Sequence, residues 1–135
     1  MPLHAMLVPF PVVCFTGAML TDITYARTAV MQWANFSAWL LAFGTIMGAL
    51  AALFGLIDFL ANPSENRPSI GWLHLIGSAI VLVLALFNDF VHARDAWTSV
   101  VPTGLTLSVV TVLVMIVSGF LGHRMAYVDV AGGRS

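Results

Sequence analysis

The stretch AWLLAFGTIMGALAALFGLIDF at residues 38–59 decides the fold class of this chain, because Asp58 is its only charged residue. An α-helix that spans a membrane needs about 20 predominantly apolar residues. The whole chain has the same character, since 60% of its residues are hydrophobic, 8% are charged and the mean hydropathy is +0.98. Soluble domains carry about 25% charged residues. The sequence therefore predicts an integral membrane protein.

Four apolar runs divide the chain, and each has the length of one membrane crossing. They cover residues 9–26, 35–59, 70–91 and 104–122. The runs lack the period-2 alternation of membrane β-strands and are longer than the roughly 10 residues of such strands. Short polar breaks separate the runs, so neighbouring helices are expected to be antiparallel. The prediction is an all-α, up-down-up-down four-helix bundle that forms a single transmembrane domain over residues 1–135.

Charge and cysteine content exclude several classes of function. The five basic residues are all arginines and the formal net charge is -1, so no basic surface is available for nucleic acid. Cys14 is the only cysteine, which excludes a disulfide within the chain. The sequence contains no HExxH, CxxCH, P-loop or serine nucleophile motif. No enzymatic reaction is therefore assigned.

The four spans define two sides of the membrane. Both chain ends and the break at 61–69 share one side, called side A, and the other two breaks share side B. Three arginines fall on side A and two on side B: Arg67, Arg124 and Arg134 against Arg27 and Arg94. The positive-inside rule then favours a cytoplasmic side A.

Small residues form a stripe on the second predicted helix and another on the fourth, at spacings of three and four residues. The stripes consist of Gly44, Gly48, Ala51, Gly55 and Asp58, and of Gly104, Ser108, Thr111, Met115, Ser118 and Gly122. Small residues allow helix backbones to approach closely in lipid, where no hydrophobic effect drives two apolar helices together. Helix packing explains these stripes, and they also leave space for a flat cofactor.

Two similar phrases, DITYAR at 22–27 and DFVHAR at 89–94, each contain an Asp, a ring three residues later and Ala-Arg. They indicate a parallel duplication of a two-helix hairpin. One constant offset aligns Asp22 with Asp89, Arg27 with Arg94 and Gly55 with Gly122. Within each phrase the Asp and the ring share a helical face and could hydrogen-bond. The alternative is that these residues only anchor helix ends at the lipid headgroups.

Polar residues gather at both sides of the predicted bundle. Side A collects His4, Asp58, His74 and His123, and side B collects Asp22, Tyr25, Arg27, Asn88, Asp89, His92, Arg94 and Asp95. His74 and His92 lie about 27 Å apart along one helix at the usual helical rise, so they mark opposite membrane edges. His4 precedes two prolines, Pro9 and Pro11, which are expected to form the first turn of the first helix. Its segment is therefore expected to be a non-helical lead-in that caps side A.

The side A residues suit several kinds of chemistry. His4 and His74 could bind haem iron axially, as pairs of imidazoles in four-helix bundles do. With Asp58 they could instead hold a non-haem transition metal. A metal-free His–Asp pair could pass protons or bind a quinone headgroup. A purely structural role, in which these side chains bond to each other and to helix ends, is the remaining alternative.

Several motifs together match one membrane family. They are LHAMLVPFPVVCFTGAMLTD at 3–22, the stretch at 38–59, His74, Asn88, HARD at 92–95, PTGLTLS at 102–108 and SGFLG at 118–122. With these motifs the chain resembles the small bacterial membrane proteins grouped as domain of unknown function 2231. The resemblance implies a multi-pass protein of the bacterial cytoplasmic membrane, and similar relatives occur beside or fused to quinoprotein dehydrogenases and cytochromes c. That context favours electron transfer or anchoring.

The chain departs from the family pattern at three places. Ala5 stands where a proline is usual, Pro9 where some members have a second histidine, and the tail YVDVAGG where many have a histidine before a Gly-Val run. The family residues that carry over to this chain are His4, Asp22, Asp58 and His74.

The prediction is a small membrane subunit that binds haem b through His4 and His74, with Asp58 as their second partner. It would serve as an anchor or electron relay to a quinone, in contact with membrane lipid and with a redox partner protein or another copy of itself. One alternative is a cofactor-free structural subunit that assembles through its small-residue stripes. Another is a protein that handles metal ions or protons through its two polar layers.

Overall fold

The computed structural model describes residues 2–61, 69–93 and 100–132, with side chains described for 3–61, 71–93 and 100–124. The described residues form α1 (Pro2–Leu7), α2 (Pro9–Thr28), α3 (Met31–Ala61), α4 (Ser69–His92), a short helical turn η1 (Val100–Gly104) and α6 (Leu105–Gly132). Four segments are long and apolar enough to cross a membrane: Leu3–Thr28, Met31–Ala61, Gly71–His92 and Val100–Arg124. The predicted all-α bundle with four spans is confirmed.

The segment that contains His4 is helical, so the expected non-helical lead-in is wrong. Val8 has helical dihedral angles, and its N–H donates to the His4 carbonyl at 3.1 Å. Pro9 begins α2, a position at which the missing N–H of a proline costs no helical hydrogen bond. As a result α1 and α2 together make the first span, and His4 has a defined place on a helix.

Two other helix ends differ from the prediction. The chain reverses after α2 through Ala29, whose φ of 54° is left-handed and whose N–H donates to the Tyr25 carbonyl at 2.7 Å. This tight turn lets α3 begin at Met31 instead of residue 35. At the other end α6 continues to Gly132, beyond the apolar run that ends at residue 122. A helix can extend past the membrane because its backbone hydrogen bonds do not depend on an apolar surface.

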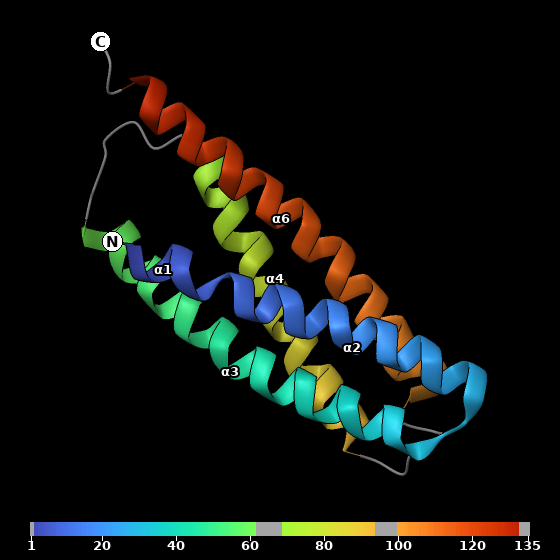
Figure 1. Cartoon of the computed structure of the whole chain (residues 1–135). Coiled ribbons are helices and arrows are strands. Elements are labelled where there is room, and N and C mark those ends of the chain that lie inside the picture. Colours follow the sequence, from blue (N-terminus) through green and yellow to red (C-terminus); the bar gives the residue numbers. More distant parts are fainter. Residues whose placement is uncertain (1, 62–68, 94–99, 133–135) are drawn as a thin grey trace.

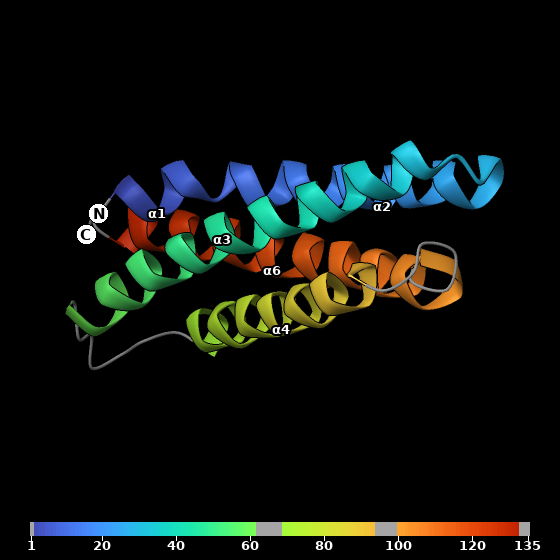
Figure 2. The ribbon, with the colours of Figure 1, turned by 90° about the horizontal axis from the view of Figure 1, so that it is seen from below.

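The helices form two antiparallel hairpins that lie against each other (Figures 1 and 2). In the first hairpin α2, continued from α1, packs along α3, and in the second α4 packs along α6. The hairpins meet less extensively, through α2 with α6 and α3 with α4. The start of α1 and the end of α6 lie at the same end of the bundle, as an up-down-up-down order requires (Figure 1).

The small-residue stripes face the inside of the bundle. A Cβ placed on Gly44 would lie 2.8 Å from the Cβ of Cys14, and one on Gly48 would lie 3.0 Å from Leu82 in the other hairpin. The buried core cluster consists of Phe15, Ala18, Leu41, Val81, Ala85 and Val112. The stripes therefore bring the backbones together, as predicted.

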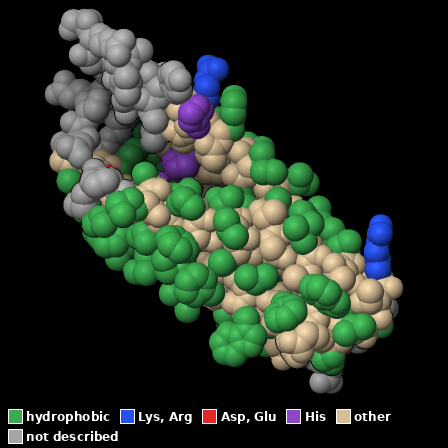
Figure 3. Space-filling model, in the orientation of Figure 1, with side chains coloured by type: hydrophobic (Ala, Val, Ile, Leu, Met, Phe, Trp, Pro, Cys, Tyr) green, Lys and Arg blue, Asp and Glu red, His purple; other side chains and the backbone are tan. Residues whose placement is uncertain are grey.

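The outer surface of the bundle is apolar along its length. Large hydrophobic side chains such as Trp39, which is 77% exposed, cover it, and the arginines visible in Figure 3 lie at the two ends. This is the surface of a protein that contacts lipid. Arg27 and Arg124 are exposed, and the other arginines that set the predicted orientation lie outside the residues whose side chains are described. The cytoplasmic placement of side A therefore stays a prediction.

Candidate functional site

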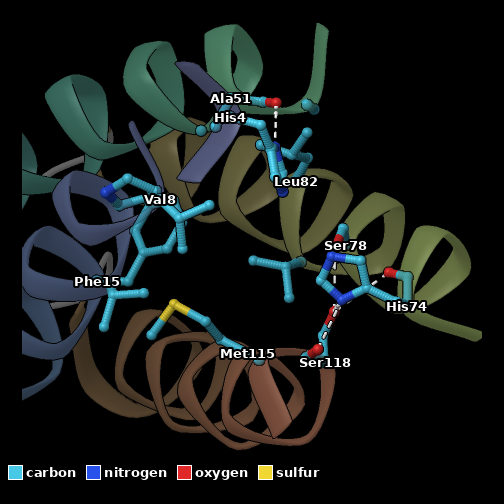
Figure 4. A pocket seen from close by; sticks show the side chains of 15 residues that line it. His4, Val8, Phe15, Ala51, His74, Ser78, Leu82, Met115 and Ser118 are labelled. Atoms are coloured by element: carbon cyan, nitrogen blue, oxygen red, sulfur yellow. Dashed lines mark hydrogen bonds between the residues drawn. The ribbon is translucent and has the colours of Figure 1, made fainter. Parts of the chain in front are cut away.

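His4 and His74 meet at side A, although they belong to helices that are far apart in the chain. His4 projects from α1 and His74 from α4, one from each hairpin. Their ring centroids are 6.2 Å apart and the ring planes are nearly perpendicular, at 84°. The two imidazoles are half-buried and both border one cavity (Figure 4).

Each imidazole is held by a backbone carbonyl of its own hairpin. The Nδ1 atom of His4 donates to the Ala51 carbonyl on α3, and that of His74 donates to the Ser118 carbonyl on α6, both at 2.7 Å. A carbonyl oxygen only accepts hydrogen bonds, so Nδ1 carries the proton in both rings. The Nε2 atom of each neutral ring then keeps a free lone pair, which is the arrangement found in histidines that bind metals.

Glycines make room for both rings in the same way. Gly55 lies four residues after Ala51, and a Cβ there would lie 2.7 Å from Nδ1 of His4. Gly122 lies four residues after Ser118, and a Cβ there would lie 2.7 Å from Cε1 of His74. The carbonyl and the glycine thus form a repeated seat for an imidazole, once in each hairpin.

This repeat supports the predicted duplication but changes its register. On α3 and α6, the carbonyl residues Ala51 and Ser118 are separated by the same number of residues as Gly55 and Gly122. The offset from His4 to His74 is three residues larger, so the first helices of the two hairpins are aligned differently from the second helices. With this larger offset Asp22 corresponds to His92, and not to Asp89 as the alignment of the two phrases proposed.

A cavity of about 100 Å³ lies between the hairpins beside the two imidazoles (Figure 4). Its polar lining comes from His4, His74, Ser78 and Ser118, and much of the remainder is apolar, including Val8, Pro11, Phe15, Val81, Leu82 and Met115. Ligand pockets usually have volumes of about 300 to 1,000 Å³. The space is therefore small, but it lies where the His4 and His74 imidazoles, which come from different hairpins, meet.

The other side A residues do not join the two imidazoles in a metal cluster. Among the residues that the structure describes, no group of three His, Cys, Asp or Glu side chains is close enough to hold a metal ion. Asp58 is half-buried on α3, two turns beyond Ala51, and its role as a cofactor contact stays a prediction. His123 is exposed on α6.

At side B, Asp22 on α2 binds His92 on α4 across the two hairpins. The Nε2 atom of His92 lies 2.8 Å from Oδ1 of Asp22, and both side chains are almost completely buried. Ser108 on α6 donates to Oδ2 of Asp22 at 2.5 Å, and Nδ2 of Asn88 donates to the Ser108 hydroxyl at 2.8 Å. Four side chains from three helices thus form one buried network.

The remaining side B residues are distributed around this network. Tyr25 is buried in an apolar cluster with Ala34 and Val100, Asp89 is half-buried and Arg27 is exposed. Arg94 and Asp95 lie outside the described residues. His92 bonds to the Asp of the other phrase, so the expected pairing of His92 with Asp89 within one phrase is replaced by a bond between the phrases.

One protein family matches this chain over nearly its whole length. Residues 1–134 match the family model described as predicted membrane protein (DUF2231). The chain belongs to this family. Comparison with curated proteins and with solved structures gives no match. The resemblance drawn from the sequence is confirmed, and it establishes the DUF2231 chain as a membrane protein with four candidate spans.

Sequence reasoning missed part of both sites in this DUF2231 chain. Ser108 belonged to a stripe explained by packing, yet its hydroxyl bonds to Asp22. The carbonyls of Ala51 and Ser118 carry no signal of their own, because every residue has a carbonyl. A signal was present in the glycines four residues later, Gly55 and Gly122, since both stripes place a glycine there.

Proposed function

We propose that this chain is a small subunit of the bacterial cytoplasmic membrane that binds haem b between its two hairpins, with His4 and His74 as axial ligands. It would anchor a redox partner protein and relay electrons between that partner and a quinone. The observation that carries the proposal is the meeting of the two imidazoles, one from each hairpin, with both Nδ1 atoms tied to carbonyls.

The separation of the rings supports two axial ligands on one iron. Metal–imidazole bonds of about 2 Å, together with the distance from each nitrogen to its ring centre, put the centres of two ligating rings about 6 Å apart. The observed separation of the His4 and His74 centroids is 6.2 Å.

The number of ligands favours haem over a bare metal ion. A bare transition metal usually takes four or more ligands from the protein and water, and the described residues offer only the two imidazoles at this place. Haem brings four ring nitrogens of its own and, when bound, supplies reversible one-electron transfer. The protein then has only to provide the axial pair, its orientation and an apolar surrounding.

The cavity of about 100 Å³ is smaller than a macrocycle, so the apolar side chains that border it, such as Val81, Leu82 and Met115, would have to move aside for haem to fit beside the two imidazoles. The contact between the hairpins is less extensive than the contact between the helices of each hairpin, which favours a rearrangement at this interface. Each imidazole has its carbonyl partner and its glycine seat within one hairpin, so this rearrangement breaks neither Nδ1 bond. The two imidazoles would supply the pair of protein ligands that haem iron needs.

A cofactor-free structural subunit is the second candidate, and the same hydrogen bonds favour it. His4 ties α1 to α3, and His74 ties α4 to α6, so each imidazole can act simply as a clamp within its hairpin. In that case the chain would assemble with itself or with a larger complex without binding a cofactor. The two candidates differ in whether the Nε2 atoms bind iron.

The visible spectrum of protein extracted in mild detergent and supplied with haemin tests the proposal. We expect a haem absorption band in the wild type that is lost in His74→Ala and in His4→Ala. His123→Ala is the matched control, because it removes an exposed imidazole on α6 and should leave the band unchanged. A wild-type protein that stays colourless and free of metal would contradict the haem proposal and favour the structural candidate.

A further inference from the structure

The side B network consists of hydrogen-bonded polar groups in the interior of the bundle. Asp22 and Asn88 are 0% exposed, Ser108 is 1% exposed and His92 is 8% exposed. The network joins α2, α4 and α6, and therefore both hairpins. Polar groups buried in a membrane protein are costly and are commonly found where protons or ions bind.

The hydrogen bonds fix the number of protons in the network. Nδ1 of His92 donates to the backbone carbonyl of Asn88 at 3.0 Å, so Nδ1 carries a proton. Nε2 of His92 and Oδ1 of Asp22 are 2.8 Å apart, and both would present lone pairs unless a proton lies between them. The other carboxyl oxygen of Asp22 accepts the proton of Ser108. One further proton is therefore shared by Asp22 and His92.

This shared proton makes the pair neutral. Without it, a buried carboxylate would face a neutral imidazole, and with one more proton the pair would carry a positive charge. The other titratable and charged groups near this end, among the described residues, are Tyr25 on α2, Asp89 on α4 and the exposed Arg27. Asp89 interacts electrostatically with His92 but is not part of the hydrogen-bonded network. The charge of the pair therefore depends first on the shared proton.

The order of these bonds differs from that of a catalytic triad with Ser108 as its nucleophile. In a catalytic triad the imidazole accepts the proton of the serine hydroxyl and the carboxylate orients the imidazole. Here Ser108 donates to Asp22, and His92 bonds to the other oxygen of the same carboxyl group. Ser108 and Asn88 instead hold the carboxyl group in a fixed position.

We propose that Asp22 and His92 form a binding site for one exchangeable proton at side B. The proton binds when the carboxylate and the neutral imidazole take it from water at that side, and it returns to water when it leaves. After it leaves, two lone pairs face each other at 2.8 Å, so that contact between α2 and α4 has to lengthen. Proton binding is thus linked to how closely the two hairpins approach at this end.

Asn88 provides a second observation that points to exchange. Its Oδ1 atom is buried, and it has no hydrogen-bond partner among the described residues. A buried acceptor without a partner is unfavourable and is often satisfied by a water molecule. A water at this oxygen would lie next to the network and could carry the proton in or out. The site goes beyond the proposed haem function, because His4 and His74 lie at the opposite end of the bundle.

Nitrogen-15 NMR of histidine-labelled protein in lipid nanodiscs, recorded from about pH 5 to pH 9, tests the proposal. In the wild type we expect the nitrogen chemical shifts of His92 to change with pH, and the change should correspond to the gain or loss of one proton per chain. In Asp22→Asn the amide can donate to Nε2 of His92 and accept from Ser108, so the network is preserved without an exchangeable proton. The His92 signals of this variant are expected to be those of a neutral ring at every pH.

His123 is the internal reference, because it is exposed on α6 and its signals should be the same in both proteins. A wild-type His92 that does not respond to pH, or that responds equally in Asp22→Asn, would overturn the proposal. If Asp22→Asn does not fold, the infrared carboxyl band of Asp22 is followed instead, identified by its perturbation in His92→Gln. A band of Asp22 that is insensitive to pH in the wild type would also overturn it.

Discussion

The two ends of the bundle use corresponding positions of the two hairpins in different ways. At side A, the ring centroids of His4 and His74 are 6.2 Å apart, and each ring bonds to a carbonyl of its own hairpin. At side B, the corresponding positions carry Asp22 and His92, which bond directly to each other at 2.8 Å. Side A therefore leaves a space between the hairpins, whereas side B closes it.

This difference shows that corresponding positions of two similar hairpins can bond the hairpins to each other at one end and border a cavity at the other. The cross-hairpin bond at side B fixes the register of α2 against α4. Side A has a cavity, and the Nδ1 bonds of its two imidazoles stay within their own hairpins, so the hairpins can separate there at lower cost. We interpret side B as the end at which the two hairpins are fixed to each other and side A as the end at which they are less tightly connected.

Asp22→Ala should produce the largest effect on this comparison. The substitution removes the carboxyl group that accepts from Ser108 and bonds to His92, so the Ser108 hydroxyl proton and Nε2 of His92 lose their buried partner. Removing one partner from a buried ion pair costs about 3 to 5 kcal/mol. The free energy of unfolding, measured by denaturant titration in mixed micelles, should fall by this amount.

His74→Ala is the matched change at side A, where the main loss is one hydrogen bond to the Ser118 carbonyl. Its cost should be about 1 kcal/mol, the net value of an ordinary hydrogen bond, plus a cavity term. If Asp22→Ala and His74→Ala lowered the free energy of unfolding equally, this would contradict the view that the hairpins are fixed to each other at side B.

Gly122→Ala tests the imidazole seat at side A and should have an intermediate effect. The new methyl group would lie 2.7 Å from Cε1 of His74, so the ring has to move away from its seat. Such overpacking costs about 1 to 3 kcal/mol, and it should also weaken haem binding. Unfolding titrations and haemin titrations of the same preparations measure both effects.

Gly119→Ala is the control for this substitution, because a Cβ at that position meets no described atom within 4 Å. Because alanine has the higher helix propensity, this control should raise the free energy of unfolding by up to about 1 kcal/mol, a change opposite in sign to that of Gly122→Ala. If the two glycine variants behaved alike, the close seat around His74 would not exist in the membrane.

Ala29→Gly should have the smallest effect and should change neither polar site. Ala29 adopts a left-handed φ of 54°, which glycine tolerates without a Cβ penalty. The substitution should raise the free energy of unfolding by about 0.5 to 1 kcal/mol. Ala49→Gly, in the exposed interior of α3, should lower it by about 1 kcal/mol and serves as the control of opposite sign. A loss of stability in Ala29→Gly would contradict the turn geometry.

The fold was predictable from the sequence because hydropathy and helix length act locally. The stretch at 38–59 identifies a span on its own, and the glycine stripes identify the inner face. The helical state of the His4 segment was not predictable, because proline is compatible both with the first turn of a helix and with a break before it. Family membership, in contrast, was predictable, because the motifs that indicate it are distributed over most of the chain.

The sites were predictable only in part, since they depend on how separate helices are aligned. The order of the four spans placed His4 and His74 at the same side, but it could not show that a carbonyl holds each ring. The partner of His92 was misjudged because Asp89 is nearer in the sequence, whereas Asp22 is the residue that bonds to it across the bundle. The register between two helices that are far apart in the chain is not contained in the periodicity of either one.

Electron paramagnetic resonance of the ferric haem complex tests the central claim most directly, because the spin state of the iron reports the number of axial ligands. Two imidazoles from His4 and His74 predict a low-spin signal in the wild type, converted to high spin in His4→Ala and in His74→Ala. A wild-type complex with a purely high-spin signal, or a low-spin signal that survives both substitutions, would show that the two imidazoles do not share one iron.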